Sequence, residues 1–169
     1  SRPTSPVTDQ PSLQPQFKPI LLAFGGPGEE GSLYRELQLA GFTVELVDLL
    51  IGGADHDLCK PEVAAKYLRA AKEGCFSFGF ISSMCKFFSI GADGRPPLFT
   101  VTEPLGIANP PPEWADYVER GRTMIYFVRD LIRALHASST PWTVENPARR
   151  HLQGTDAYWE EFASWGTLW

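Results

Sequence analysis

Residues 20–31, ILLAFGGPGEEG, join a short apolar run to a cluster of glycines. The run that ends at Phe24 is too short for a helix and is typical of a buried strand. After the glycines, SLYRELQLAG carries leucines at helical spacing and ends at Gly41, a residue type common just past the end of a helix. The stretch therefore predicts a strand, a tight turn and a helix.

The turn and the next strand together form a candidate nucleotide-type site. Gly26, Gly28 and Gly31 fit the pattern G-x-G-x-x-G, and Asp48 ends the β-branched run FTVELVD. In this context the glycines allow a close approach of backbone to ligand, and the acid binds ribose hydroxyls. A dinucleotide and S-adenosylmethionine both fit the pattern. A ligand-free turn, whose acids only suit the helix dipole, is the third interpretation.

The charged residues of the turn favour S-adenosylmethionine over a dinucleotide. A dinucleotide places its pyrophosphate at the helix N-terminus, where Glu29 and Glu30 would repel it. S-adenosylmethionine has no phosphate and carries a positive sulfonium and an ammonium, which acids attract. We therefore expect S-adenosylmethionine as the cofactor. The expected contacts are Phe24, Gly26 and Gly28 in the turn, Asp48 at the ribose and Asp57 at the adenine amino group, although Asp57 also fits a solvated loop acid.

Strand and helix patterns alternate along the rest of the chain. Residues 61–74 begin with Pro and end with Gly, as helices often do. Residues 76–83, FSFGFISS, are typical of a strand buried on both faces. An apolar ladder from Trp114 to His136 predicts a long helix, and residues 141–147, PWTVENP, predict a fourth strand. The alternation predicts an α/β, Rossmann-type parallel sheet with helices on both faces.

Composition limits the classes of function. The chain has 169 residues, of which 43% are hydrophobic, so it is long and apolar enough for one globular domain. Its net charge of −5 is unlike that of a domain that holds nucleic acid unaided. The three cysteines, Cys59, Cys75 and Cys85, lack the spacing of a disulfide scaffold or a zinc site. With no membrane-length run and no secretory signal, we expect an intracellular protein, nuclear or cytoplasmic, without metal or membrane contact.

The two ends of the sequence differ from its middle. Residues 1–18 are rich in Pro, Ser and Gln and predict a linker or arm, which leaves residues 19–169 as the domain. Residues 160–169, EEFASWGTLW, end on aromatic side chains that would be poor surface. We expect the sheet to be incomplete at this end and to be completed by a further part of the chain or by another protein chain.

Two later motifs add a possible chemistry. Residues 84–91, MCKFFSIG, follow the third strand, and residues 144–147, VENP, follow the long helix. Together with the glycine turn and Asp48, their order resembles the cytosine-5 DNA methyltransferase family, in a divergent Glu-Asn-Pro branch. Cys85 matches the cysteine of the family's Pro-Cys-x-x-Phe-Ser loop, and Glu145 matches the acid of its Glu-Asn pair. The resemblance covers roughly residues 20–152.

The resemblance implies an S-adenosylmethionine-dependent methyl transfer to cytosine C5 in DNA. Cys85 would add as a thiolate to C6 of the base, which turns C5 into a nucleophile. Glu145 would supply a proton or a strong hydrogen bond at N3. The target base would leave the duplex to reach both groups.

The sequence departs from the family in ways that keep other functions open. Met84 stands where the family has proline, and neither a Gln-x-Arg-x-Arg segment nor a recognition region follows Asn146. The alternative is a catalytically inactive fold that serves as a binding or structural module in a larger protein or assembly. Cys85 would then be a small apolar residue and Glu145 a strand-end acid. A dinucleotide-dependent oxidoreductase is a third hypothesis.

Overall fold

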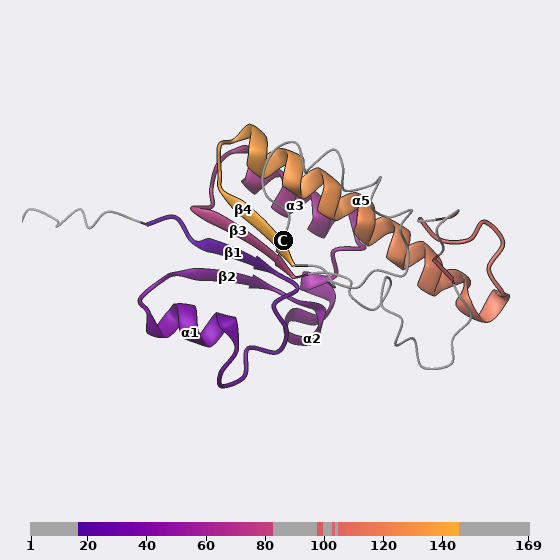
Figure 1. The fold of residues 1–169 in the computed structure, drawn as a ribbon, viewed down its shortest axis with the longest axis horizontal. Helices are drawn as coiled ribbons and strands as arrows, with labels where there is room; N and C mark the ends of the chain where they lie inside the picture. Colours follow the sequence, from indigo (N-terminus) through magenta and orange to yellow (C-terminus); the bar gives the residue numbers. More distant parts are fainter. Residues whose placement is uncertain (1–16, 83–97, 100–102, 104, 146–169) are drawn as a thin grey trace, which may run out of the picture.

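The computed structural model describes residues 17–82, 98–99, 103 and 105–145, in which strands and helices alternate (Figure 1). Cys85, most of the expected linker and residues 146–169 lie outside the described residues, so the domain boundaries stay predictions. In chain order the elements are β1 (Ile20–Ala23), α1 (Leu33–Leu39), β2 (Val44–Val47), α2 (Leu49–Gly52), η1 (Gly53–His56), α3 (Pro61–Lys72), β3 (Phe78–Ser82), η2 (Pro112–Trp114), α5 (Ala115–Ala137) and β4 (Trp142–Glu145).

The four strands form one parallel sheet in the order β2-β1-β3-β4. Ala23 at the end of β1 lies beside Val47 of β2 on one side and beside Ile81 of β3 on the other. Ser82 of β3 lies beside Glu145 of β4. The carboxyl ends of the strands therefore meet at one edge. The chain changes direction across the sheet between β1 and β3, which makes that gap the topological switch point.

Helices cover both faces of this sheet, as the alternation predicted. Figure 1 shows α3 and α5 together on one side and α1 on the other, next to β2. Leu21, Ala23 and Ile81 belong to the buried cluster that α3 and α5 complete. Leu22 alternates with them along β1 and is buried on the opposite face. Right-handed crossovers between parallel strands produce this arrangement. The α/β parallel sheet is thus confirmed.

The longest helix, α5, supplies much of the core. Nine of its residues are buried, among them Val128, Leu131 and Leu135 with no more than 1% exposure. They recur at helical spacing because that face packs on the sheet and on α3. The predicted ladder from Trp114 to His136 is confirmed, and its central glycine, Gly121, lies on the buried face.

Two features of the first half differ from the sequence prediction. The strand predicted to end at Asp48 ends at Val47, because the Asp48 side chain accepts a hydrogen bond from Leu50 N–H and caps α2. The short α2 and η1 that follow were not predicted. Four-residue helices are too short to show a period, so only the cap could have revealed them.

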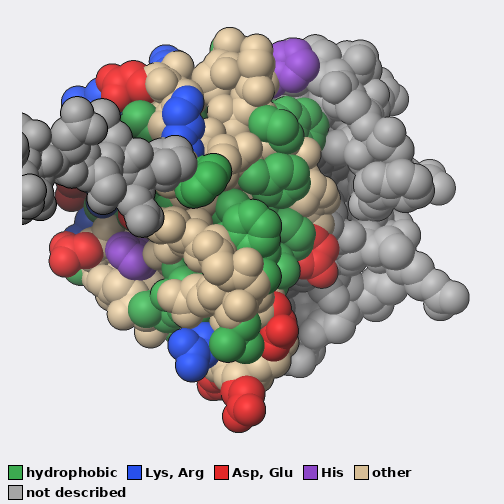
Figure 2. Space-filling model, turned by 90° about the vertical axis from the view of Figure 1, so that its left-hand side faces the viewer, with side chains coloured by type: hydrophobic (Ala, Val, Ile, Leu, Met, Phe, Trp, Pro, Cys, Tyr) green, Lys and Arg blue, Asp and Glu red, His purple; other side chains and the backbone are tan. Residues whose placement is uncertain are grey.

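The side of the molecule where the strands begin carries a group of apolar side chains (Figure 2). Figure 2 shows hydrophobic side chains gathered across the middle of this face, with charged side chains around them. Phe17, Leu39 and Phe42, which precede or connect the first strands, are exposed. The opposite edge, where the strands end, carries the polar side chains Asp48, Ser82 and Glu145, next to the exposed apolar side chains of α2 (Leu49, Leu50 and Ile51). A site for polar chemistry is therefore best sought at that edge.

A glycine in β3 sets how closely α5 approaches the sheet. A Cβ atom at Gly79 would lie 2.5 Å from Leu135 Cδ1, far inside van der Waals contact. Leu135 is fully buried, so it has little room to move.

We expect Gly79→Ala to lower the free energy of unfolding by about 1–3 kcal/mol, because it overpacks the contact between β3 and α5. Urea unfolding of the purified chain measures this. In a Leu135→Ala background, Gly79→Ala should lower the free energy of unfolding much less, because the added Cβ methyl group then has space. An equal cost in both backgrounds would show that Leu135 does not set the distance.

Candidate functional site

The candidate site lies at the carboxyl ends of the strands, around the switch point between β1 and β3. From the strand register, Phe24 and Asp48 follow the paired residues Ala23 and Val47, while Ser82 and Glu145 pair directly. In open α/β sheets, ligands bind in the crevice outside this edge. The structure therefore brings four of the five predicted cofactor residues (Phe24, Gly26, Gly28 and Asp48) to one edge and places Glu145 on the same edge.

The glycine turn uses backbone angles that few other residues adopt. Gly26 has φ 75° and Gly28 has φ 67°, both in the left-handed region. A Cβ atom at Gly26 would meet nothing within 4 Å, so the backbone there borders open space. At Gly28 a Cβ atom would instead lie 3.0 Å from Tyr34 Cδ1, so the turn leaves room for a ligand at Gly26 and not at Gly28.

Phe24 connects the turn to the core. Its φ of 62° is left-handed, which costs a non-glycine residue about 1–2 kcal/mol. Its ring packs edge-on against Phe127 of α5, with centroids 6.4 Å apart. The backbone N–H of Phe24 donates to Val47 O at 2.8 Å. These contacts hold the strained residue in place, so the turn leaves β1 in a fixed direction.

Asp48 links the glycine turn to the second strand. Its Oδ2 accepts a hydrogen bond from Gly26 N–H at 2.9 Å, and its Oδ1 accepts one from Leu50 N–H at 2.8 Å. An ionised carboxylate has about four acceptor positions, so each oxygen keeps capacity for a ligand hydroxyl. The sequence predicted that the turn and the acid would contact one cofactor; their direct hydrogen bond to each other comes from the structure.

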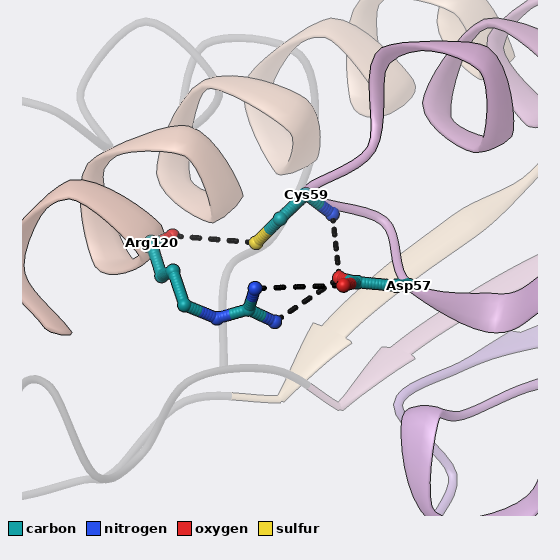
Figure 3. Close-up of polar contacts among 3 residues, drawn as sticks. All are labelled: Asp57, Cys59 and Arg120. Carbon is teal, nitrogen blue, oxygen red and sulfur yellow. Dashed lines mark hydrogen bonds and ion pairs between the residues drawn. The ribbon is translucent and has the colours of Figure 1, made fainter. Parts of the chain in front are cut away.

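Asp57 does not join this group but forms a second one with Arg120 and Cys59 (Figure 3). Arg120 donates from both terminal nitrogens to the Asp57 carboxylate, at 3.1 and 3.4 Å, and Cys59 N–H donates to it at 3.1 Å. The carboxylate therefore joins the segment before α3 to α5. Its predicted contact with an adenine amino group stays a prediction. Arg120 was not singled out from the sequence, because a partner 63 positions away leaves no local signal.

The surroundings of the Cys59 thiol do not favour the nucleophilic thiolate form. Its Sγ donates to Arg120 O at 3.7 Å. Burial raises the pKa of the thiol, and the nearby Asp57 carboxylate raises it further, so Cys59 is protonated at neutral pH. Cys75 is exposed. Cys85, the predicted nucleophile, lies outside the described residues.

Glu145 is the last residue of β4, and its side chain is oriented by β3. Its Oε2 accepts a hydrogen bond from Ser82 Oγ at 2.7 Å. Glu145 is exposed while Ser82 is half-buried, so the carboxylate is accessible and bonded to a less mobile partner. A carboxyl group held this way can accept or donate a hydrogen bond to a ligand above the sheet.

Within the ranges given above, no group of three or more His, Cys, Asp or Glu side chains comes together as a metal site would require. No helix in the described part of the chain has both the length and the apolar character needed to cross a membrane.

Comparison of the chain with models of known protein families, with curated proteins and with solved structures finds no match.

The ion pair of Asp57 with Arg120 makes stability depend on pH. Burial alone would raise the pKa of Asp57, but the hydrogen bonds from Arg120 and Cys59 N–H lower it below its ordinary value of 3.8. A carboxyl group whose pKa is lower in the folded state stabilises the fold above that ordinary value. The stabilisation is lost as the pH falls through the lower, folded-state pKa.

We expect a double-mutant cycle of Asp57→Asn and Arg120→Met to give a coupling energy of up to about 1 kcal/mol at neutral pH, since Arg120 is 40% exposed. The coupling should be smaller at an acidic pH below 3.8, because Asp57 loses its charge as the pH falls through its lowered, folded-state pKa. Urea unfolding at both pH values measures it. The surface pair Arg122–Glu119 on α5 is the matched control, with an expected coupling of about 0.3–0.5 kcal/mol. If the coupling energy between Asp57 and Arg120 is the same at both pH values, the charge of Asp57 does not stabilise the pair.

Proposed function

We propose that the domain binds S-adenosylmethionine at the carboxyl edge of the sheet and acts as a DNA cytosine-5 methyltransferase. The proposal that the domain binds S-adenosylmethionine rests on the hydrogen bond from Gly26 N–H to Asp48 Oδ2. This hydrogen bond holds an open backbone turn and a ribose-binding type of acid side by side at the switch point. Both fit a nucleoside ligand: Gly26 borders open space, and Asp48 keeps acceptor capacity.

The charge and length of the elements favour S-adenosylmethionine over a dinucleotide. The turn contains Glu29 and Glu30 and neither Lys nor Arg. The helix after it, α1, has only seven residues, and Ser32 already accepts from Arg35 N–H at its start. A pyrophosphate at the start of α1 would lie at a short helix whose first turn is already capped, and the two carboxylates would repel it. A sulfonium cation would instead be attracted.

The proposed reaction uses two side chains of this chain. Cys85, as a thiolate, adds to C6 of a cytosine in DNA, while Glu145 hydrogen-bonds N3 and compensates the charge that develops on the ring. S-adenosylmethionine, when bound, supplies the methyl group that C5 accepts. Loss of the C5 proton to a base then expels the thiolate and restores the aromatic ring. The position of Glu145 on the cofactor edge supports its role.

A non-catalytic module is the second candidate, and one observation favours it. All four arginines of α5 (Arg120, Arg122, Arg129 and Arg133) form ion pairs with acids of the same chain. They therefore do not provide a stripe of unpaired positive charge for a phosphate backbone. In this hypothesis the fold binds cofactor or another protein chain, and DNA contact, if any, comes from a further part of the assembly.

We expect S-adenosylmethionine, and not NAD, to bind the purified chain. Asp48→Asn should weaken binding about tenfold, because it removes charge and acceptors at the ribose hydroxyls but keeps a residue suited to cap α2. Calorimetry measures both. Asp55→Asn, a nearby exposed acid, is the matched control and should bind as wild type. Binding of NAD alone would favour the oxidoreductase.

We expect a duplex oligonucleotide with 5-fluorocytosine to form a covalent adduct with the wild-type chain in the presence of S-adenosylmethionine, because fluorine at C5 blocks the proton loss. Cys85→Ser should abolish the adduct. Glu145→Gln should slow its formation about 100-fold or more. Cys59→Ser is the control that leaves adduct formation intact. Cofactor binding with no wild-type adduct would favour the non-catalytic module.

A further inference from the structure

We infer that Ser82 is a positioning residue that fixes the Glu145 carboxyl group for its contact with the base. The inference rests on the proposed function, since it assigns a role within the same reaction. It adds a residue that the sequence motifs do not single out: Ser82 is the last residue of β3, three positions before Cys85.

The geometry of the pair is that of a strong hydrogen bond. Ser82 and Glu145 lie directly opposite each other in the parallel register of β3 and β4. The distance of 2.7 Å between Ser82 Oγ and Glu145 Oε2 is typical of a hydroxyl that donates to a charged oxygen. The backbones of both residues belong to the sheet, so donor and acceptor start from fixed positions.

The hydrogen bond also distinguishes the two oxygens of the carboxyl group. Oε2 receives the serine proton, whereas Oε1 receives no hydrogen bond from any residue that the structure describes. While Ser82 donates to Oε2, the oxygen Oε1 keeps its capacity to bond to a ligand.

This arrangement reduces the cost of ordering Glu145 during the reaction. A glutamate at a strand end has three rotatable side-chain bonds and would otherwise sample many orientations. Groups that are oriented before the substrate arrives contribute most to catalysis, since no reorganisation is needed in the transition state. Removing Ser82 should therefore lower the rate of the chemical step and leave cofactor and DNA binding almost unchanged.

The test compares five variants by single-turnover adduct formation on the 5-fluorocytosine duplex. Ser82→Ala should lower the maximal rate about tenfold, with little change in the DNA concentration for half-maximal rate or in S-adenosylmethionine affinity. Ser82→Thr, which keeps the hydroxyl, should restore most of the rate. In a Glu145→Ala background, Ser82→Ala should have no further effect. Ser77→Ala is the matched control. Ser77 lies directly before β3, and its hydroxyl group donates to Pro19 O.

The outcomes separate this inference from the proposed function. If the wild-type chain forms the adduct and Ser82→Ala forms it equally fast, Ser82 does not position Glu145, and the methyl transfer stands. If Ser82→Ala and Ser82→Thr lose rate and unfolding stability equally, the role of Ser82 is structural and the inference is overturned. If the wild-type chain forms no adduct, the proposed function fails and the inference fails with it.

Discussion

The hydrogen bond between Gly26 N–H and the Asp48 carboxylate joins the turn after β1 to the end of β2. The same carboxylate starts α2 through Leu50 N–H, so one side chain fixes a turn, a strand end and a helix start. These groups can meet only because β1 and β2 are parallel neighbours whose last residues pair. The candidate site therefore depends on the register of the sheet as much as on its side chains.

The sheet edge is chemically different from the layer beneath it. Leu21, Leu22 and Ile81 are almost completely buried directly below the turn and the strand ends. Burying a carboxylate among such residues would be costly unless it were fully hydrogen-bonded. Asp48 and Glu145 instead lie at the ends of the strands, with hydrogen bonds on one side and exposure on the other. Exposed carboxylates of this kind are compatible with positively charged and hydroxyl-bearing ligands, and this is one basis of the proposed cofactor.

One helix connects the parts of the domain that the site needs. α5 packs on α3, contacts the Gly79 position of β3 through Leu135, and supports Phe24 through Phe127. Near its start, Arg120 holds Asp57 and the segment before α3. A shift of α5 would therefore move the glycine turn and the first residues of β3 together. This coupling explains why the core of a small domain bears on the geometry of its candidate site.

The sequence by itself determined the elements and the turn. Apolar runs, helical ladders and flanking glycines and prolines are local signals, and they predicted the four strands, three of the helices and the glycine turn. Tertiary structure decided which distant side chains pair. Asp57 meets Arg120 and Ser82 meets Glu145, each across 63 positions. No local pattern encodes such a pair, because strand order, register and the helix packing on the sheet set the distance between its members.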